Sequence, residues 1–193
     1  PVQKAISYSM TSFFTTGGIR GGKKKMDKFY PRSFNMGIAR TIFEAVGGFD
    51  ESMRYGEDVD LSYRITRAGT QAVLLRGAEV CHKRRTNICG FFRQVAHSGE
   101  ARITLTRRHP GTLKIVHLLP AAFTLGSLLC LLRAALWCWW WLLLIAVVAL
   151  AWLLDALLRE KSLPVALMAI PACFTQLYGY GFGFIKGLFC RFL

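Results

Sequence analysis

The chain has 193 residues, of which 53% are hydrophobic, and its 25 basic against 11 acidic residues give a net charge of +14. Residues 1–114 hold 20 basic and 9 acidic residues, a net charge of +11, whereas residues 115–193 hold 5 and 2 and are otherwise almost wholly apolar. This division excludes a disordered chain, a collagen-like chain and a small disulfide scaffold. The sequence predicts a basic soluble region joined to a membrane region.

The N-terminal part offers few motifs. The sequence begins with Pro1 and no charged-then-apolar leader follows, which favours either a processed chain or the C-terminal part of a longer one. Residues 5–16 are rich in Ser, Thr and Phe and are expected to be extended. The glycine-rich basic loop at 17–25 is interpreted equally well as a lid over an anionic ligand or as a solvated surface loop, and it lacks the Gly-Lys-Ser/Thr ending of a P-loop.

The excess of positive charge does not by itself indicate a nucleic-acid partner. No basic helix or strand interleaved with aromatic residues is present in the sequence. A basic face beside a bilayer is explained more simply by the anionic headgroups of membrane lipids. We therefore expect membrane lipids, and no nucleic acid, among the partners.

A short helix and a longer one are predicted in the middle of the soluble region. Residues 38–46 carry apolar side chains at four-residue spacing and end at a glycine pair. A second helix begins at Glu57, Asp58 and Asp60. The simple interpretation is that Asp58 is the N-cap and that the other carboxylates complement the helix dipole. Three carboxylates within four residues exceed what an ordinary cap needs, which indicates chemistry as well.

The rest of the soluble region predicts strands and one more helix. Residues 71–82 alternate loosely and predict one or two strands that end at His82, and a helix follows over about 87–102. The six cysteines make no disulfide framework, and Cys81-His82 with Cys89 lacks a fourth ligand at zinc-like spacing. Free thiols suit a reducing environment on the cytoplasmic side.

Three apolar segments, at about 115–132, 134–155 and 162–186, are long enough to cross a membrane. Arg133 is the sole charge between the first two, so we expect a tight hairpin there; one long tilted helix is the alternative. Four tryptophans follow at positions typical of an interfacial aromatic belt: Trp137, Trp139, Trp140 and Trp141.

The ends of these segments predict orientation and packing. Residues 155–161 are expected to form a short loop, and the Lys and Arg residues near the segment ends place the soluble region in the cytoplasm. The chain is thus expected to be a multi-pass protein of the inner membrane. Gly179 and Gly183 form a small-xxx-small pair, which predicts a helix-packing face used within this chain rather than for dimerisation.

Residues 35–40, 47–51 and 56–64 together resemble bacterial glycosyltransferase family 2 in the strings Asn-Met-Gly-Ile-Ala-Arg, Gly-Gly-Phe-Asp-Glu and Gly-Glu-Asp-Val-Asp-Leu-Ser-Tyr-Arg. His82, Phe92-Arg93-Gln94 and residues 99–102 fit the same pattern, which covers roughly residues 29–105. The apolar tail is similar to that of membrane-anchored members.

The resemblance implies an α/β fold. Residues 1–114 would be the C-terminal portion of a GT-A type glycosyltransferase domain, its acceptor and base half, and residues 115–193 two or three transmembrane helices. The implied reaction is an inverting transfer of a sugar from a nucleotide-sugar donor to a lipid-linked or glycan acceptor.

The resemblance also implies roles for single residues. The Asp of the family's Glu-Asp pair is the general base, which is Asp58 here, and Glu57 would orient it or bind an acceptor hydroxyl. A carboxylate at a helix N-terminus stays ionised, but the same dipole lowers its basicity, so its strength as a base must come from its position. Asn35, Gly37 and Arg40 match a segment that lines the acceptor side.

Two further candidates are Asp60 and His82. Asp60 is grouped with the substrate-binding residues, although its position also suits the helix start. His82 matches the position that completes the metal site in some relatives, and is otherwise an ordinary histidine at a strand end. The implied cofactor is a divalent cation, Mg²⁺ or Mn²⁺, with the remaining ligands in a missing N-terminal half.

The departure from the family pattern lies upstream. The strand-terminal Asp-x-Asp of the nucleotide-binding half is absent, since Asp58-Val59-Asp60 opens a helix in the context of the base motif. The chain is therefore expected to be a fragment that lacks the donor half and is inactive alone. The alternative is a non-catalytic membrane scaffold, or partner-binding module, with a transferase-like remnant.

Overall fold

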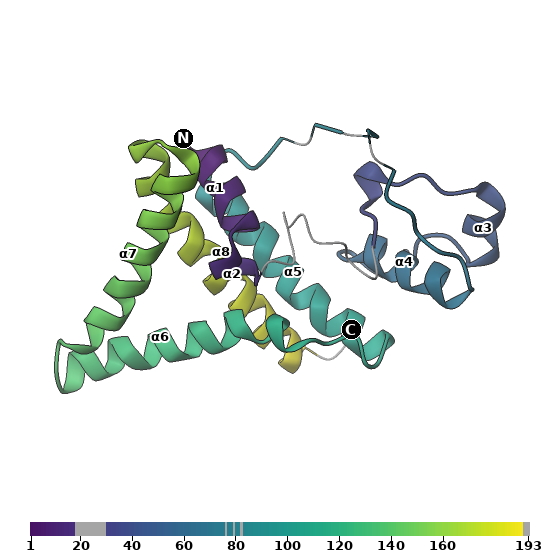
Figure 1. Ribbon diagram of the computed structural model, residues 1–193. Helices are drawn as coiled ribbons and strands as arrows, with labels where there is room; N and C mark the ends of the chain where they lie inside the picture. Colours follow the sequence, from purple (N-terminus) through teal and green to yellow (C-terminus); the bar gives the residue numbers. More distant parts are fainter. Residues whose placement is uncertain (18–29, 76, 79, 82, 191–193) are drawn as a thin grey trace. The chain divides into compact units, whose positions relative to one another are not determined.

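The computed structural model describes residues 1–17, 30–75, 77–78, 80–81 and 83–190, and these described residues are mostly helical and contain no β-strand. The chain divides into two compact units (Figure 1). The first contains residues 1–22, 84–103 and 113–193, and the second contains residues 23–83 and 104–112. The stretches 1–22 and 84–103, which precede the apolar tail in sequence, thus cluster with it in space.

The first unit is a bundle built around the C-terminal helix. Helix α8 packs against α1, α6 and α7, and in Figure 1 α6 and α7 diverge from their connecting turn as two arms of a V. The elements of this unit are α1 (Val2–Thr11), α2 (Phe13–Thr16), most of α5 (Ile88–Arg108), η2 (Ile115–His117), α6 (Leu119–Leu136), α7 (Trp141–Glu160) and α8 (Leu163–Phe189). Helices α6, α7 and α8 are long and apolar enough to cross a membrane.

The N-terminal segment is helical, so its prediction as extended was wrong. Ala5, Ile6 and Ser9 are fully buried in α1, which packs against α8. This spacing places the three side chains on one helical face. The burial of that face outweighs the modest helix propensity of the serines, because propensity is a weak preference that tertiary packing routinely overrides.

The membrane helices differ from the prediction at their ends. Arg133 lies in the last turn of α6, and the connecting turn falls at residues 137–140, after rather than at the charge. Helix α7 continues through the charged residues expected to form a loop, because Arg159 pairs with Asp155 one turn earlier at 2.9 Å. Only Lys161 leaves the helix, with a φ of 49°. The two helices are separate, which confirms the hairpin over the single tilted helix.

The glycines of α8 pack within the chain, as predicted. A Cβ on Gly183 would clash with the backbone of Ala96 in α5, and one on Gly99 of α5 would clash with the backbone of Tyr180. A Cβ on Gly179 would clash with Cγ2 of the Val95 side chain. The two helices therefore approach each other at backbone distance, which only glycine permits.

The second unit positions the candidate site. Its elements are η1 (Ser33–Asn35), α3 (Arg40–Ala45), α4 (Glu57–Arg67) and the last turn of α5. Helices α3 and α4 confirm the two helices predicted for this region, and α5 confirms the one predicted over 87–102, although it runs six residues further, to Arg108.

The strands predicted at 71–82 are not present among the described residues of that segment. Val73, Leu74 and Leu75 are 74%, 64% and 69% exposed and have no regular structure. A strand exists only by hydrogen bonding to a neighbouring strand, and the described residues supply no neighbour. The predicted α/β class is thus not confirmed here, and the described structure is helical.

Candidate functional site

The first turn of α4 places three carboxylates next to one another. Gly56 is the N-cap, with a φ of 83°, and Glu57, Asp58 and Asp60 follow in the first turn. Asp58 is therefore not the N-cap, but its Oδ1 still accepts a hydrogen bond from the N–H of Val59 at 2.8 Å. This bond fixes the direction of the carboxylate at the helix start.

The Asp58 side chain is largely buried and lies beside one positive charge. Its Oδ1 is 3.3 Å from Nη1 of Arg32, and the two side chains are 12% and 41% exposed. Oδ2 makes no contact with the described part of the chain that would occupy it. The arrangement leaves one carboxylate oxygen for a further partner.

Asp60 faces the interior of the second unit. Its Oδ1 lies 2.8 Å from Nε2 of His109, and its Oδ2 accepts from Nε of Arg64 at 2.8 Å. Arg64 also donates to the carbonyl oxygens of Val46 at 2.5 Å and Gly48 at 2.7 Å. Asp60 is 2% exposed and both its carboxylate oxygens are hydrogen-bonded, so it joins α4 to two other segments. These contacts favour a structural role at the start of α4 over contact with a substrate.

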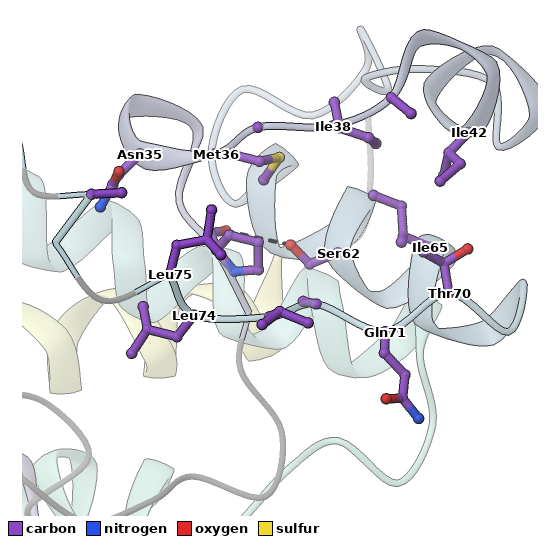
Figure 2. Close-up of a pocket in the computed structure, with 16 residues that line it drawn as sticks. Asn35, Met36, Ile38, Ile42, Ser62, Ile65, Thr70, Gln71, Leu74 and Leu75 are labelled. Atoms are coloured by element: carbon purple, nitrogen blue, oxygen red, sulfur yellow. Dashed lines mark hydrogen bonds between the residues drawn. The ribbon is translucent and has the colours of Figure 1, made fainter.

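A pocket of about 370 Å³ opens in the second unit, shown in Figure 2. Asn35 and Gly37, two of the predicted acceptor-side residues, line it. Most of the wall is aliphatic and comes from the segment after η1, from α4 and from residues 70–78. The polar groups on the wall include Ser62, Thr70 and Gln71, a pattern typical of a small-molecule site with few orienting polar groups.

The pocket adjoins the turn that carries Asp58. Ser62 lines the pocket, and its Oγ donates to the backbone oxygen of Asp58 at 2.7 Å and to that of Pro31 at 3.4 Å, the contact drawn in Figure 2. Pro31 also lines the pocket and directly precedes Arg32, the ion-pair partner of Asp58. Asn35 and Gly37 thus line the pocket, whereas Asp58 is not a lining residue and is connected to the pocket through Ser62 and the Pro31–Arg32 segment.

The other predicted site residues are placed differently. Arg40 is 88% exposed and forms an ion pair with Glu44 at 2.7 Å, outside the pocket. Glu57 is half-buried at the start of α4. His82, and the basic loop from residue 18 onward, lie outside the described residues. Within the described residues, no group of three His, Cys, Asp or Glu side chains is placed to hold a metal ion.

The sequence analysis did not identify His109, which pairs with a residue of α4, or Asp50, which stabilises the loop before α4. His109 carries no periodic or motif signal, and its pairing with Asp60 spans 49 positions. Asp50 was more accessible to prediction, since an Asp two residues before a Ser is typical of an Asx turn: its Oδ1 accepts from the N–H of Ser52 at 2.9 Å. Hydrogen bonds from Ser52 and the Arg108 guanidinium hold the pKa of Asp50 well below its usual range.

Comparison with known proteins supplies an independent line of evidence. No family model matches the chain. Over 134 residues, 68% of this chain, it is 25% identical to the succinoglycan biosynthesis protein ExoA of Rhizobium meliloti (strain 1021). Over 65 residues, 34% of this chain, it is 42% identical to the pre-mycofactocin glycosyltransferase of two Mycobacterium tuberculosis strains. The chain resembles bacterial glycosyltransferases.

The chain matches only part of the length of these relatives. The matched regions span 41% of ExoA and 14% of the pre-mycofactocin enzyme, so the chain spans less than half the length of either. No solved structure matches it. The resemblance derived from the sequence strings is confirmed, and the three apolar helices fit the membrane anchor expected with it.

Proposed function

We propose that the protein is a membrane-anchored glycosyltransferase that transfers a sugar, with inversion, from a nucleotide-sugar donor to a lipid-linked or glycan acceptor. The observation that carries the proposal is the position of Asp58 at the start of α4, where its backbone oxygen accepts a hydrogen bond from Ser62, a residue of the pocket that Asn35 and Gly37 also line. The glycosyltransferase relatives support the reaction class. We further propose that the pocket side of Asp58 receives the acceptor.

In the proposed reaction Asp58 is the general base. The acceptor oxygen forms a bond to the anomeric carbon as its proton passes to the Asp58 carboxylate, and the bond from that carbon to the nucleotide diphosphate breaks. Arg32 and the N–H of Val59 both contact Oδ1 of Asp58, and these contacts hold the carboxylate in one direction. We propose that its contribution comes from alignment with the acceptor hydroxyl.

The donor-binding half, the cation and the orientation in the membrane complete the proposal. The donor-binding half would be supplied by sequence beyond these 193 residues, and the chain alone would then be inactive. A divalent cation, Mg²⁺ or Mn²⁺, belongs to the proposal with His82 as one ligand and the others in the donor half; when bound, it would neutralise the diphosphate charge. The second unit would face the cytoplasm from the inner membrane, as the distribution of Lys and Arg favours.

The test is Asp58→Asn in the full-length enzyme, assayed with its donor and acceptor at matched protein levels. Loss of a general base is expected to lower kcat by about 10²- to 10⁴-fold. Glu160→Gln, which removes a carboxylate at the end of α7, serves as the control for a change of charge alone and should leave kcat unchanged.

A kcat near that of the parent enzyme in Asp58→Asn would remove the base role. The scaffold interpretation would then be preferred if the parent also shows no sugar transfer with any nucleotide-sugar tested. If the parent is active and only Asp58→Asn is unaffected, the reaction class stands and another group must take the proton.

A further inference from the structure

The turn between α6 and α7 carries a cluster of one arginine and four tryptophans. The guanidinium carbon of Arg133 lies 4.8 Å from the ring centre of Trp137 and 5.9 Å from that of Trp141. Trp139 and Trp140 stack on each other with ring centres 4.3 Å apart. We call Arg133 together with residues 137–141 the Arg–Trp turn.

The side chains of the Arg–Trp turn offer hydrogen-bond donors and almost no acceptors. A guanidinium has five N–H donors and each indole has one, and neither group can accept a hydrogen bond through nitrogen. Within the described part of the chain, neither Arg133 nor the four tryptophans donate a side-chain hydrogen bond, and Arg133 pairs with no carboxylate. The ligand that matches this surface is therefore an acceptor with negative charge.

Four backbone N–H groups of the turn are already paired. The N–H groups of Trp137 and Cys138 donate to the carbonyl oxygen of Arg133, and those of Trp141 and Leu142 donate within the turn at 3.3 and 2.9 Å. These four groups are thus not available to an external acceptor, whereas the guanidinium and indole N–H groups of the side chains are.

The Arg–Trp turn is also exposed, at the shared end of two candidate spans. Trp137, Trp139 and Trp140 are 74%, 57% and 59% exposed, while Trp152 inside the bundle is 2% exposed. A hairpin of two membrane-crossing helices places its turn at the level of the lipid headgroups, where tryptophan is enriched.

We propose that the Arg–Trp turn binds the phosphate of an anionic phospholipid. The phosphodiester and ester oxygens of such a lipid are acceptors, and a planar guanidinium binds phosphate through two parallel N–H bonds. The rings of Trp137 and Trp141 hold the Arg133 guanidinium over their faces. The cation is therefore fixed at the turn instead of extending into water. This proposal stands independently of the sugar-transfer reaction.

A carbohydrate is the other ligand that tryptophan faces bind, and the geometry favours it less. Trp139 and Trp140 each cover one face of the other, and Arg133 lies over one face of Trp137. A sugar ring stacked on the other face of one of these indoles would leave the guanidinium charge unpaired. A phosphate pairs with that charge at the outer edge of the guanidinium.

The test reconstitutes the full chain in phosphatidylcholine vesicles that contain a small fraction of brominated lipid. Bromine placed near the headgroup end of the acyl chain quenches nearby tryptophan. Quenching by brominated phosphatidylglycerol is compared with quenching by brominated phosphatidylcholine at equal mole fraction. We expect local enrichment of the anionic lipid by about fivefold, the factor that corresponds to roughly 1 kcal/mol, the net contribution of about one hydrogen bond.

The variants separate this site from the general positive charge of the chain. Arg133→Gln should abolish the preference for the anionic lipid, and Arg133→Lys should retain part of it. Lys161→Gln removes one positive charge at the opposite end of α7 and should leave the preference unchanged. Equal quenching by the two lipids in the parent chain, an unchanged preference in Arg133→Gln, or protection from quenching by a soluble oligosaccharide would overturn the proposal.

Discussion

Nε2 of His109 lies 2.8 Å from Oδ1 of Asp60, and the two side chains are 5% and 2% exposed. The ring of His109 also packs against that of Tyr63, with ring centres 4.9 Å apart. This pair fixes the segment that follows α5 against the first two turns of α4, the helix that also carries Asp58. The candidate base therefore depends on a contact that takes no part in the proposed chemistry.

Replacing His109 should loosen α4. We expect His109→Phe to keep the packing against Tyr63 but to leave one buried oxygen of Asp60 without its partner, which lowers the free energy of local unfolding by about 1–3 kcal/mol. Hydrogen exchange of the α4 amides measures this change. Arg40→Gln, which breaks an exposed ion pair, should change it by less than about 0.5 kcal/mol. Equal protection in His109→Phe and the parent would contradict the prediction.

The close approach of α5 and α8 predicts a contrast between two glycines. Gly183→Ala introduces a methyl group that clashes with Ala96, so we expect the free energy of unfolding of the first unit, measured in detergent, to fall by about 1–3 kcal/mol. Gly126 lies in α6, and a methyl group added there would have nothing within 4 Å, so Gly126→Ala should be neutral or stabilising by up to about 1 kcal/mol. A similar loss in both variants would contradict the clash as its cause, and no loss in Gly183→Ala would show that movement of the helices relieves the clash.

His117 predicts a dependence of stability on pH. Burial, together with the nearby charges of Arg102 and Lys114, lowers the pKa of His117 to about 4 in the folded protein. The unfolded chain binds the proton near pH 6.5, so between about pH 6.5 and 4 the unfolded state holds more protons and stability falls as the pH falls. Thermal midpoints measured across this window should decline less steeply for His117→Gln. An identical slope in the variant would exclude His117 as the cause.

Tyr8 anchors α1 to the end of α7. Its hydroxyl donates to Oδ2 of Asp155 at 2.6 Å, and burial raises the pKa of the hydroxyl above its ordinary value. We expect Tyr8→Phe to lower the free energy of unfolding by about 1–3 kcal/mol, since the lost hydrogen bond has a charged acceptor. Tyr178→Phe removes a hydroxyl that makes no hydrogen bond within the described residues and should have a smaller effect. Denaturation in detergent compares the two, and equal losses would contradict the role of Asp155.

Local sequence patterns predicted most of the helices correctly, but they also predicted strands that the described residues do not form. The helix at Glu57 and the glycine packing of Gly183 follow from residues a few positions apart, so periodicity and small-residue spacing reveal them. A strand depends on a partner elsewhere in the chain, and residues 71–82 show only the propensity for one. The same reasoning explains α1, whose helix is stabilised by the distant α8 rather than by its own composition.

The candidate site divides in the same way. Asp58, Asn35 and Gly37 were predicted from the family resemblance; Asn35 and Gly37 line one pocket, and the roles of all three stay predictions. Asp60 pairs with His109, 49 positions away, and Asp58 pairs with Arg32, 26 positions away. Such pairs form only when the fold brings distant residues together, so a pattern of nearby residues in the sequence does not predict them.

The exposed segment around Val73, Leu74 and Leu75 has a practical consequence for anyone who purifies this chain. These three adjacent apolar side chains are exposed and lie outside any helix or strand, so they offer a surface on which a second copy can associate. We therefore expect concentrated preparations to precipitate through this segment, even when detergent covers the membrane helices. A lysine at position 74 should increase solubility without a change in the helical content.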